Sequence, residues 1–166
     1  IDYLTLVGHG DVVRSCDISP DKTFIVSASW DNSLKIWDTH SGTERLSLRG
    51  HTDAVWDCAI SSDSTFVVSA SYDKTLKIWD SQTGKERVTL IGHKDVVLGC
   101  AISANDTTIA SVSSDKTLKI WNAHSGLCLA TLHVDWSLSS CTWFADGQRL
   151  IAAGGDGVFI LKLVNE

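Results

Sequence analysis

The chain repeats itself every 42 residues, and this period restricts its fold more than any other feature of the sequence. The landmarks that recur in register are Gly8-His9, Gly50-His51 and Gly92-His93, the tryptophans Trp37, Trp79 and Trp121, and the cysteines Cys16, Cys58 and Cys100. Self-similarity at such a period indicates a repeat architecture, in which each copy is one small structural unit. We therefore treat residues 1–166 as a single module of four copies, placed at about 1–42, 43–84, 85–126 and 127–166.

Each copy has room for four short strands and shows no sustained helical periodicity. Residues 23–28 (TFIVSA) are rich in β-branched side chains and lie between turn-forming residues. Residues 33–37 (SLKIW) alternate apolar and polar side chains, as a half-buried strand does. The sequence therefore predicts an all-β fold built from four-stranded antiparallel units.

This pattern, with Gly-His near the start of a copy and Trp-Asp at its end, resembles the WD-repeat (WD40) family of β-propellers. The pairs that end the first three copies are Trp37-Asp38, Trp79-Asp80 and Trp121-Asn122, of which the last departs from the pattern by one residue. The resemblance implies a β-propeller with four WD repeats per chain. The segment DKTLKIW, which occurs at residues 73–79 and 115–121, is most similar to the WD-repeat arrays attached to bacterial signalling NTPases.

A histidine, a serine and an aspartate recur together with the repeated tryptophan. The three sets are His9, Ser27, Asp31 and Trp37, then His51, Ser69, Asp73 and Trp79, then His93, Ser111, Asp115 and Trp121. In a hydrolase, the imidazole of such a trio would take the serine proton and the carboxylate would fix its tautomer. A catalytic triad is needed only once, so three identical sets favour a buried hydrogen-bond network. The resemblance implies that Trp donates to Ser, Ser to His, and His to Asp.

The fourth copy lacks this set of residues. By sequence register, Ala152 replaces the serine and Lys162 replaces the tryptophan, while Val134 or His133 falls near the histidine position. Only Asp156 is retained. We expect the network to be absent from this copy.

Two other positions in each copy are candidates for binding a partner, because the resemblance places them on the family's usual binding face. One position holds Arg14, Trp56, Leu98 and Ser139 in successive copies, and the other holds Trp30, Tyr72, Ser114 and Gly155. Trp, Tyr and Arg are the residues enriched where interfaces gain most of their binding energy. Positions that also accept Ser and Gly are not fixed by packing, so a binding role is favoured. Stacking of nucleic-acid bases on the aromatic rings is the alternative.

Charge and cysteine usage narrow the class of partner and the compartment. The formal net charge of −6 argues against a partner held by phosphate neutralisation, so we predict a protein or peptide ligand and no nucleic acid. The apolar runs are too short to span a membrane. The five cysteines show no paired spacing for zinc, which predicts no metal, no cofactor and a reducing cytoplasm.

Four blades are too few for the seven or eight that the resemblance implies for a closed ring. We therefore expect a homodimer, in which two chains form one eight-bladed ring. The alternative is that the chain is the C-terminal part of a longer WD-repeat protein. A propeller enzyme or lectin acting at the central channel is a third possibility, for which the inner strands offer only Asp17, Asp57 and Thr142, with Gly99 interrupting. The sequence thus predicts a non-catalytic scaffold or sensor module that binds proteins.

Overall fold

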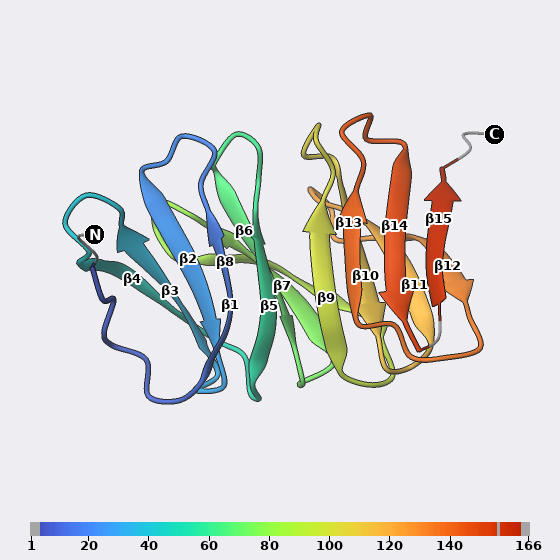
Figure 1. Ribbon diagram of the computed structural model, residues 1–166, viewed down its shortest axis with the longest axis horizontal. Coiled ribbons are helices and arrows are strands. Elements are labelled where there is room, and N and C mark those ends of the chain that lie inside the picture. Colours follow the sequence, from blue (N-terminus) through green and yellow to red (C-terminus); the bar gives the residue numbers. More distant parts are fainter. Residues whose placement is uncertain (1–3, 156, 164–166) are drawn as a thin grey trace.

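The fold is a row of four antiparallel β-sheets that stand side by side in sequence order (Figure 1). The computed structural model describes residues 4–155 and 157–163. All of the regular structure in these residues is β-strand, so the part of the chain that is described contains no helix able to cross a membrane. The all-β architecture predicted from the repeat is confirmed.

The first two sheets have four strands each, joined in the order of the chain. The strands of the first sheet are β1 (Val13–Ile18), β2 (Phe24–Ser29), β3 (Ser33–Asp38) and β4 (Glu44–Arg49). Those of the second sheet are β5 (Val55–Ile60), β6 (Phe66–Ser71), β7 (Thr75–Asp80) and β8 (Glu86–Ile91). Each sheet is a simple up-and-down meander.

The third sheet follows the same plan, but the fourth sheet departs from it. The third contains β9 (Val97–Ile102), β10 (Thr108–Ser113), β11 (Thr117–Asn122) and β12 (Cys128–His133). The fourth contains β13 (Ser140–Trp143), β14 (Arg149–Gly154) and β15 (Gly157–Lys162). The first three sheets thus have the four strands predicted for each unit, and the fourth has three strands among the described residues.

Burial explains why the middle strands of each sheet are so apolar. In β3, Leu34 and Ile36 are buried on one face and Trp37 is buried on the other. Strand β4 at the outer edge alternates exposed and buried residues, with Leu48 buried. The turn before each outer strand needs a backbone conformation that favours glycine, as at Gly84 with its φ of 69°.

The hydrophobic cores lie between the sheets. Phe24, Val26 and Leu34 of the first sheet pack with Val55 and Trp79 of the second. The second and third sheets, and the third and fourth, enclose equivalent clusters. Each sheet is thus stabilised mainly by its neighbours in the row, as expected for a repeat protein.

One consequence is an exposed apolar face on the first sheet, which has no sheet before it. Val13 and Ile18 are 51% and 53% exposed, whereas the equivalent Val55 and Ile60 are buried between sheets. Cys16 is exposed on the same strand for the same reason. We name Val13, Cys16 and Ile18 the leading face.

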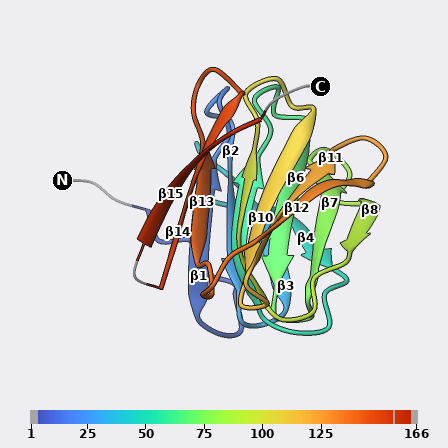
Figure 2. The ribbon, with the colours of Figure 1, turned by 90° about the vertical axis from the view of Figure 1, so that its right-hand side faces the viewer.

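A matching face lies on the fourth sheet, at the other end of the row. Val158 and Ile160 of β15 are 69% and 66% exposed, whereas Leu118 and Ile120 occupy the same positions on β11 and are buried. Figure 2 looks onto this end of the molecule, where β15 forms the free edge. We name Val158 and Ile160 the trailing face.

The position of residues 3–6, just before Gly8-His9, predicts that they form the outer strand of a sheet. Tyr3 lies outside the described residues, and residues 4–10 form no strand. Even so, Leu4 and Leu6 lie against Gly42, just as Leu46 and Leu48 lie against Gly84. This segment therefore follows the path of an outer strand without a sheet to pair with.

Candidate functional site

Each of the first three sheets contains the same chain of hydrogen bonds, formed by the four repeated residues. The Trp Nε1 donates to the Ser Oγ at 2.8 Å, and the His Nε2 lies 2.7 Å from the same oxygen. The His Nδ1 lies 2.8, 2.7 and 2.9 Å from the aspartate Oδ2 in the first, second and third sheets. Within each of these sheets, the structure thus brings together the four residues predicted to form one set. The three sets are His9, Ser27, Asp31 and Trp37, then His51, Ser69, Asp73 and Trp79, then His93, Ser111, Asp115 and Trp121.

The protonation states suit a neutral imidazole between a hydroxyl and a carboxylate. Burial lowers the pKa of His93, although Asp115 acts in the opposite direction. Burial alone would raise the pKa of Asp115, but hydrogen bonds from Thr117, the Lys94 N–H and His93 outweigh it and lower this pKa to about 2. The aspartate is therefore ionised and accepts from a neutral ring at neutral pH.

The surroundings of the serine in these sets do not suit a hydrolytic site. Ser69 and Ser111 are fully buried, and each hydroxyl oxygen already accepts from the tryptophan above it. A substrate carbonyl has no route to such an oxygen, whereas nucleophilic catalysis requires one. The geometry favours the network interpretation of the repeated residues.

The carboxylates on the inner strands also serve to join neighbouring sheets. Asp57 accepts from Ser15 Oγ at 2.8 Å and from the backbone N–H of Cys100 at 3.0 Å. Asp17 accepts from the backbone N–H of Ile60 at 2.9 Å. Burial raises the pKa of Asp57. Among the described residues, no group of three or more His, Cys, Asp and Glu side chains could hold a metal ion.

The predicted partner-binding positions lie at irregularities of the innermost strands. The pairing of β1 with β2 shifts between Val13 and Ser15, so that Arg14 has no cross-strand partner. Trp56 and Leu98 sit at the same irregularity in the second and third sheets. A β-bulge of this kind redirects a side chain away from the ladder. Sequence periodicity did not reveal these bulges.

The second set of positions lies beside the bulges, in the turns that follow β2, β6 and β10. The backbone N–H of Trp30 donates to Val12, and that of Tyr72 donates to Ala54, each at 2.9 Å. Ser114 is held in the same way by Val96 at 3.1 Å. In each of the first three sheets, the turn and the bulge therefore lie next to each other at the same end of the sheet.

Four of these side chains form a stack across the junction of the first two sheets. The Trp56 ring lies 5.8 Å from Trp30 and 4.9 Å from Tyr72, with interplanar angles of 18° and 16°. The guanidinium carbon of Arg14 lies 4.4 Å from the centroid of Trp56, in a cation–π contact. Trp30 is 41% exposed. We call Arg14, Trp30, Trp56 and Tyr72 the aromatic stack.

A hollow of about 200 Å³ adjoins the stack. It is lined by Arg14, Ser15, Trp56, Asp57, Leu98, Ser139 and Ser140. All four residues predicted at the first position, from Arg14 to Ser139, therefore meet around one hollow. Ser114 lies outside it, within 3.4 Å of Ser137 Oγ. Gly155 is exposed in the turn of the fourth sheet.

Comparison with known proteins agrees with this repeat geometry. The family described as "WD domain, G-beta repeat" matches residues 2–38, 42–80 and 84–122. The chain belongs to the WD40 repeat family. The predicted resemblance is thereby confirmed for three repeats, and we refer to the sheets as blades from here on. The finer likeness to bacterial signalling NTPases stays a prediction.

Curated relatives of this WD40 chain match single repeats. MST50-interacting protein 11 of Pyricularia oryzae is 44% identical over 39 residues, which cover 24% of this chain and 12% of that protein. Small ribosomal subunit protein RACK1 of Neurospora crassa is 45% identical over 38 residues, covering 23% and 12%. Ribosome assembly protein 4 of Chaetomium thermophilum is 49% identical over 37 residues, covering 22% and 7%.

Solved WD40 structures match nearly the whole chain. The structure of U3-55K superposes with a TM-score of 0.90 and 28% identity, covering 95% of this chain and 51% of that one. The RRP9 WD40 repeats give a TM-score of 0.90 and 29% identity, covering 95% and 50%. This WD40 chain therefore spans about half the length of those structures, and its four blades form part of a propeller.

The described residues of the fourth blade of the WD40 chain form no such network, as predicted, but the register of this blade differs from the prediction. Ala152 pairs with Cys141 just as Ser111 pairs with Cys100, so the serine position is confirmed. Leu161, and not Lys162, holds the tryptophan position, because it pairs with Leu150 on β14.

The cause is a shorter turn between β14 and β15. Gly154 pairs with Gly157, so only two residues join these strands. A side chain at Gly155, where φ is 51°, would collide with Trp136. His133 ends β12 and Val134 packs in the third core, so neither supplies the missing ring. Asp156 lies outside the described residues.

We expect the stability conferred by Asp115 to be lost in acid. An unfolded aspartate titrates near pH 4, whereas the folded carboxyl titrates near 2. The contribution is thus complete above about pH 4 and declines as the pH falls toward 2. The difference in unfolding free energy between the wild type and Asp115→Asn, measured in urea, should narrow over this range. A constant difference would contradict the assignment.

Proposed function

We propose that this WD40 chain is a non-catalytic scaffold or sensor module that binds a protein partner on the side of the blades that bears the aromatic stack. The observation that carries this proposal is the stack itself, with its exposed Trp30 and its central Trp56. No cofactor is needed for such a role. Membership of the WD40 family supports it at the level of fold and repeat.

The stack has the physical properties of a binding hot spot. Its rings are large and are fixed by one another, so that little conformational entropy is lost when a partner covers them. The Arg14 guanidinium adds a donor beside the rings, and Arg, Trp and Tyr are the residues that dominate interface energetics. A partner that inserts an apolar or planar side chain beside Trp30 fits this surface best.

A protein ligand is favoured over nucleic acid by the net charge of −6. The names of some relatives point to ribosomes and ribosome assembly. Bases could stack on Trp30 and Tyr72, so RNA binding is included as an outcome of the experiment.

Replacement of Trp56 tests the proposal. Trp56→Ala should weaken partner binding by roughly a hundredfold, because a central hot-spot ring contributes about 2–4 kcal/mol. Affinity capture followed by quantitative mass spectrometry would compare the wild type, Trp56→Ala, Trp56→Phe and the double variant Trp30→Ala/Trp56→Ala. Thermal melting checks that each variant is folded.

Unchanged recovery of partners by the folded double variant would overturn the proposal. The conservative Trp56→Phe should keep most of the binding, because an aromatic ring still lies between Trp30 and Tyr72. A parallel titration with polyuridylate separates the two ligand classes. If the variants lost only the binding of RNA, the ligand of this surface would be a nucleic acid and not a protein.

We further propose that a second copy of the chain covers the two open faces and completes an eight-bladed ring. The leading and trailing faces carry the same kinds of apolar side chain as the two halves of each internal interface. Further WD repeats of a longer protein are the alternative cover. The five cysteines are free in the structure, which supports a cytoplasmic location.

A further inference from the structure

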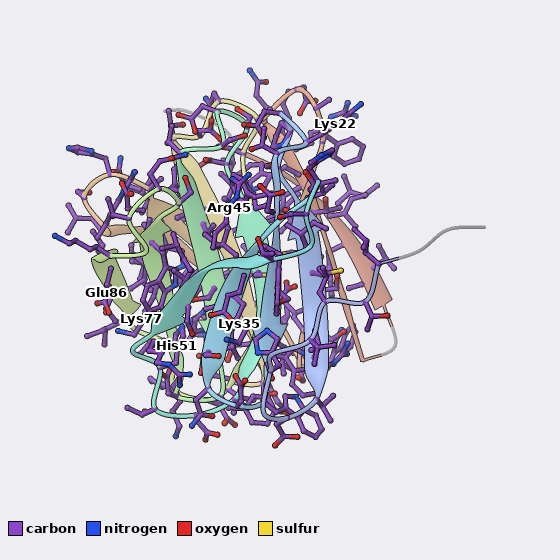
Figure 3. All side chains as sticks on the ribbon, turned by 90° about the vertical axis from the view of Figure 1, so that its left-hand side faces the viewer. Lys22, Lys35, Arg45, His51, Lys77 and Glu86 are labelled. Carbon is purple, nitrogen blue, oxygen red and sulfur yellow. The ribbon has the colours of Figure 1, made fainter. Side chains whose placement is uncertain are left out.

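A buried lysine in the third strand of each of the first two blades is neutralised by a glutamate of the outer strand. Lys35 Nζ lies 2.6 Å from Glu44 Oε2, and Lys77 Nζ lies 2.7 Å from Glu86 Oε2. Figure 3 labels Lys35, Lys77 and Glu86 on this part of the molecule. In the second blade, Lys77 also donates to Thr89 at 2.8 Å.

The third blade keeps the lysine and the threonine but has lost the carboxylate. Lys119 Nζ donates to Thr131 at 2.9 Å, as Lys77 does to Thr89. Cys128 pairs with Trp121 at the position where Glu86 pairs with Trp79 in the second blade. Within the described residues, Lys119 forms no ion pair.

The missing glutamate leaves a real space. In the first two blades, the Glu44 and Glu86 carboxylates lie 3.2 and 3.3 Å from the point where a side chain would start on Gly8 and Gly50. At Gly92 in the third blade, the three nearest atoms belong to Trp121 and Lys119, and none of them is a carboxylate oxygen. The same place opens into a cavity of about 400 Å³, which is lined by Gly92, Lys94, Asp115, Thr117, Lys119, Thr131 and His133.

The lining favours an anion. Lys94 and Lys119 supply two positive charges against one negative charge from Asp115. The Asp115 carboxylate already accepts from Thr117, from His93 and from the backbone N–H of Lys94. The Thr131 hydroxyl and the His133 ring add further polar groups to the rim. Charge-assisted hydrogen bonds from such groups are the strong ones.

We propose that this cavity binds the side-chain carboxylate of an acidic peptide, which takes the place that Glu44 and Glu86 occupy in the sister blades. The chain itself indicates the occupant, because in the first two blades the lysine equivalent to Lys119 lies within hydrogen-bond distance of a glutamate carboxylate. The site is separate from the aromatic stack, and the proposal stands whether or not that surface binds a partner.

The experiment uses the full 166-residue chain and three probes. Capped Gly-Glu-Gly, capped Gly-Gln-Gly and inorganic phosphate are titrated while the backbone amide NMR signals of Lys94, Thr131 and His133 are followed. The glutamate peptide should shift these signals in a saturable manner at millimolar concentrations, and the glutamine peptide should not.

Cys128→Glu is the decisive variant, because it returns an internal carboxylate to Lys119. It should weaken binding of the glutamate peptide roughly tenfold or more and raise the melting temperature of the protein. The matched Cys128→Ser should do neither. Lys119→Met should also lose binding, which provides a second route if Cys128→Glu folds poorly. Equal binding of both peptides, or unchanged binding to Cys128→Glu, would overturn the proposal. Saturation by phosphate without response to the glutamate peptide would also overturn it.

Discussion

His51→Ala should lower the free energy of unfolding by about 3 kcal/mol, the scale for disrupting a buried hydrogen-bond network. The ring is the middle member of its set, so its removal takes away the acceptor of the Ser69 hydroxyl and one of the hydrogen-bond partners of the Asp73 carboxylate. Both groups remain buried or half-buried in the second blade. Urea unfolding followed by circular dichroism measures the effect.

His40→Ala is the matched control, because this histidine is exposed in the turn after β3. Its substitution should change stability by less than about 0.5 kcal/mol. An esterase assay on the same samples addresses the alternative role. Ester hydrolysis by the wild type that disappears in folded Ser69→Ala would show that the set is catalytic, and a loss of stability equal to that of His40→Ala would contradict the network.

Ile160→Glu should convert a dimer into monomers. Light scattering of the wild type should give twice the 18.0 kDa of one chain, and the variant should give 18.0 kDa. The reason is that Ile160 lies on the trailing face, where a second copy would bury the new carboxylate without a partner. We expect the dissociation constant to rise by roughly a hundredfold or more.

Ile91→Glu provides the control for this prediction. Ile91 is 77% exposed at the end of β8, away from both open faces, so its substitution should leave the dimer intact. A wild-type chain that is folded and monomeric at high concentration would rule out closure by a second copy. Further WD repeats would then be the remaining means of covering the two faces.

Most of the fold could be predicted from the repeat, because each of the first three copies independently shows the same pattern of strands and turns. Spacing alone located the network residues, since an offset such as that from His51 to Asp73 recurs unchanged in the next copy. The register of the fourth blade was wrong at Leu161, because the loss of one residue from a turn moves every later side chain. Sequence register cannot reveal such a loss when the landmark residues are missing.

The candidate site was less accessible to sequence reasoning. Trp30, Trp56 and Tyr72 were singled out from their types, but their mutual stacking depends on where two blades meet. The significance of Cys128 was not predicted. It becomes clear only when Cys128 is compared with Glu86, which forms an ion pair with Lys77 in the second blade. Alignment of the copies at Cys128 would have offered a signal.

The bulges on the innermost strands of the first three blades separate the residues that pair the strands from the side chains of the proposed binding face. Val13 and Ser15 keep their ladder partners, while Arg14 between them has none. The same is true around Trp56 and Leu98. In each of these three blades one side chain can therefore change without altering strand pairing, so a new specificity of the proposed face would require only a few substitutions and no new backbone. The number of blades that carry such a bulge would then set how many variable side chains the proposed face contains.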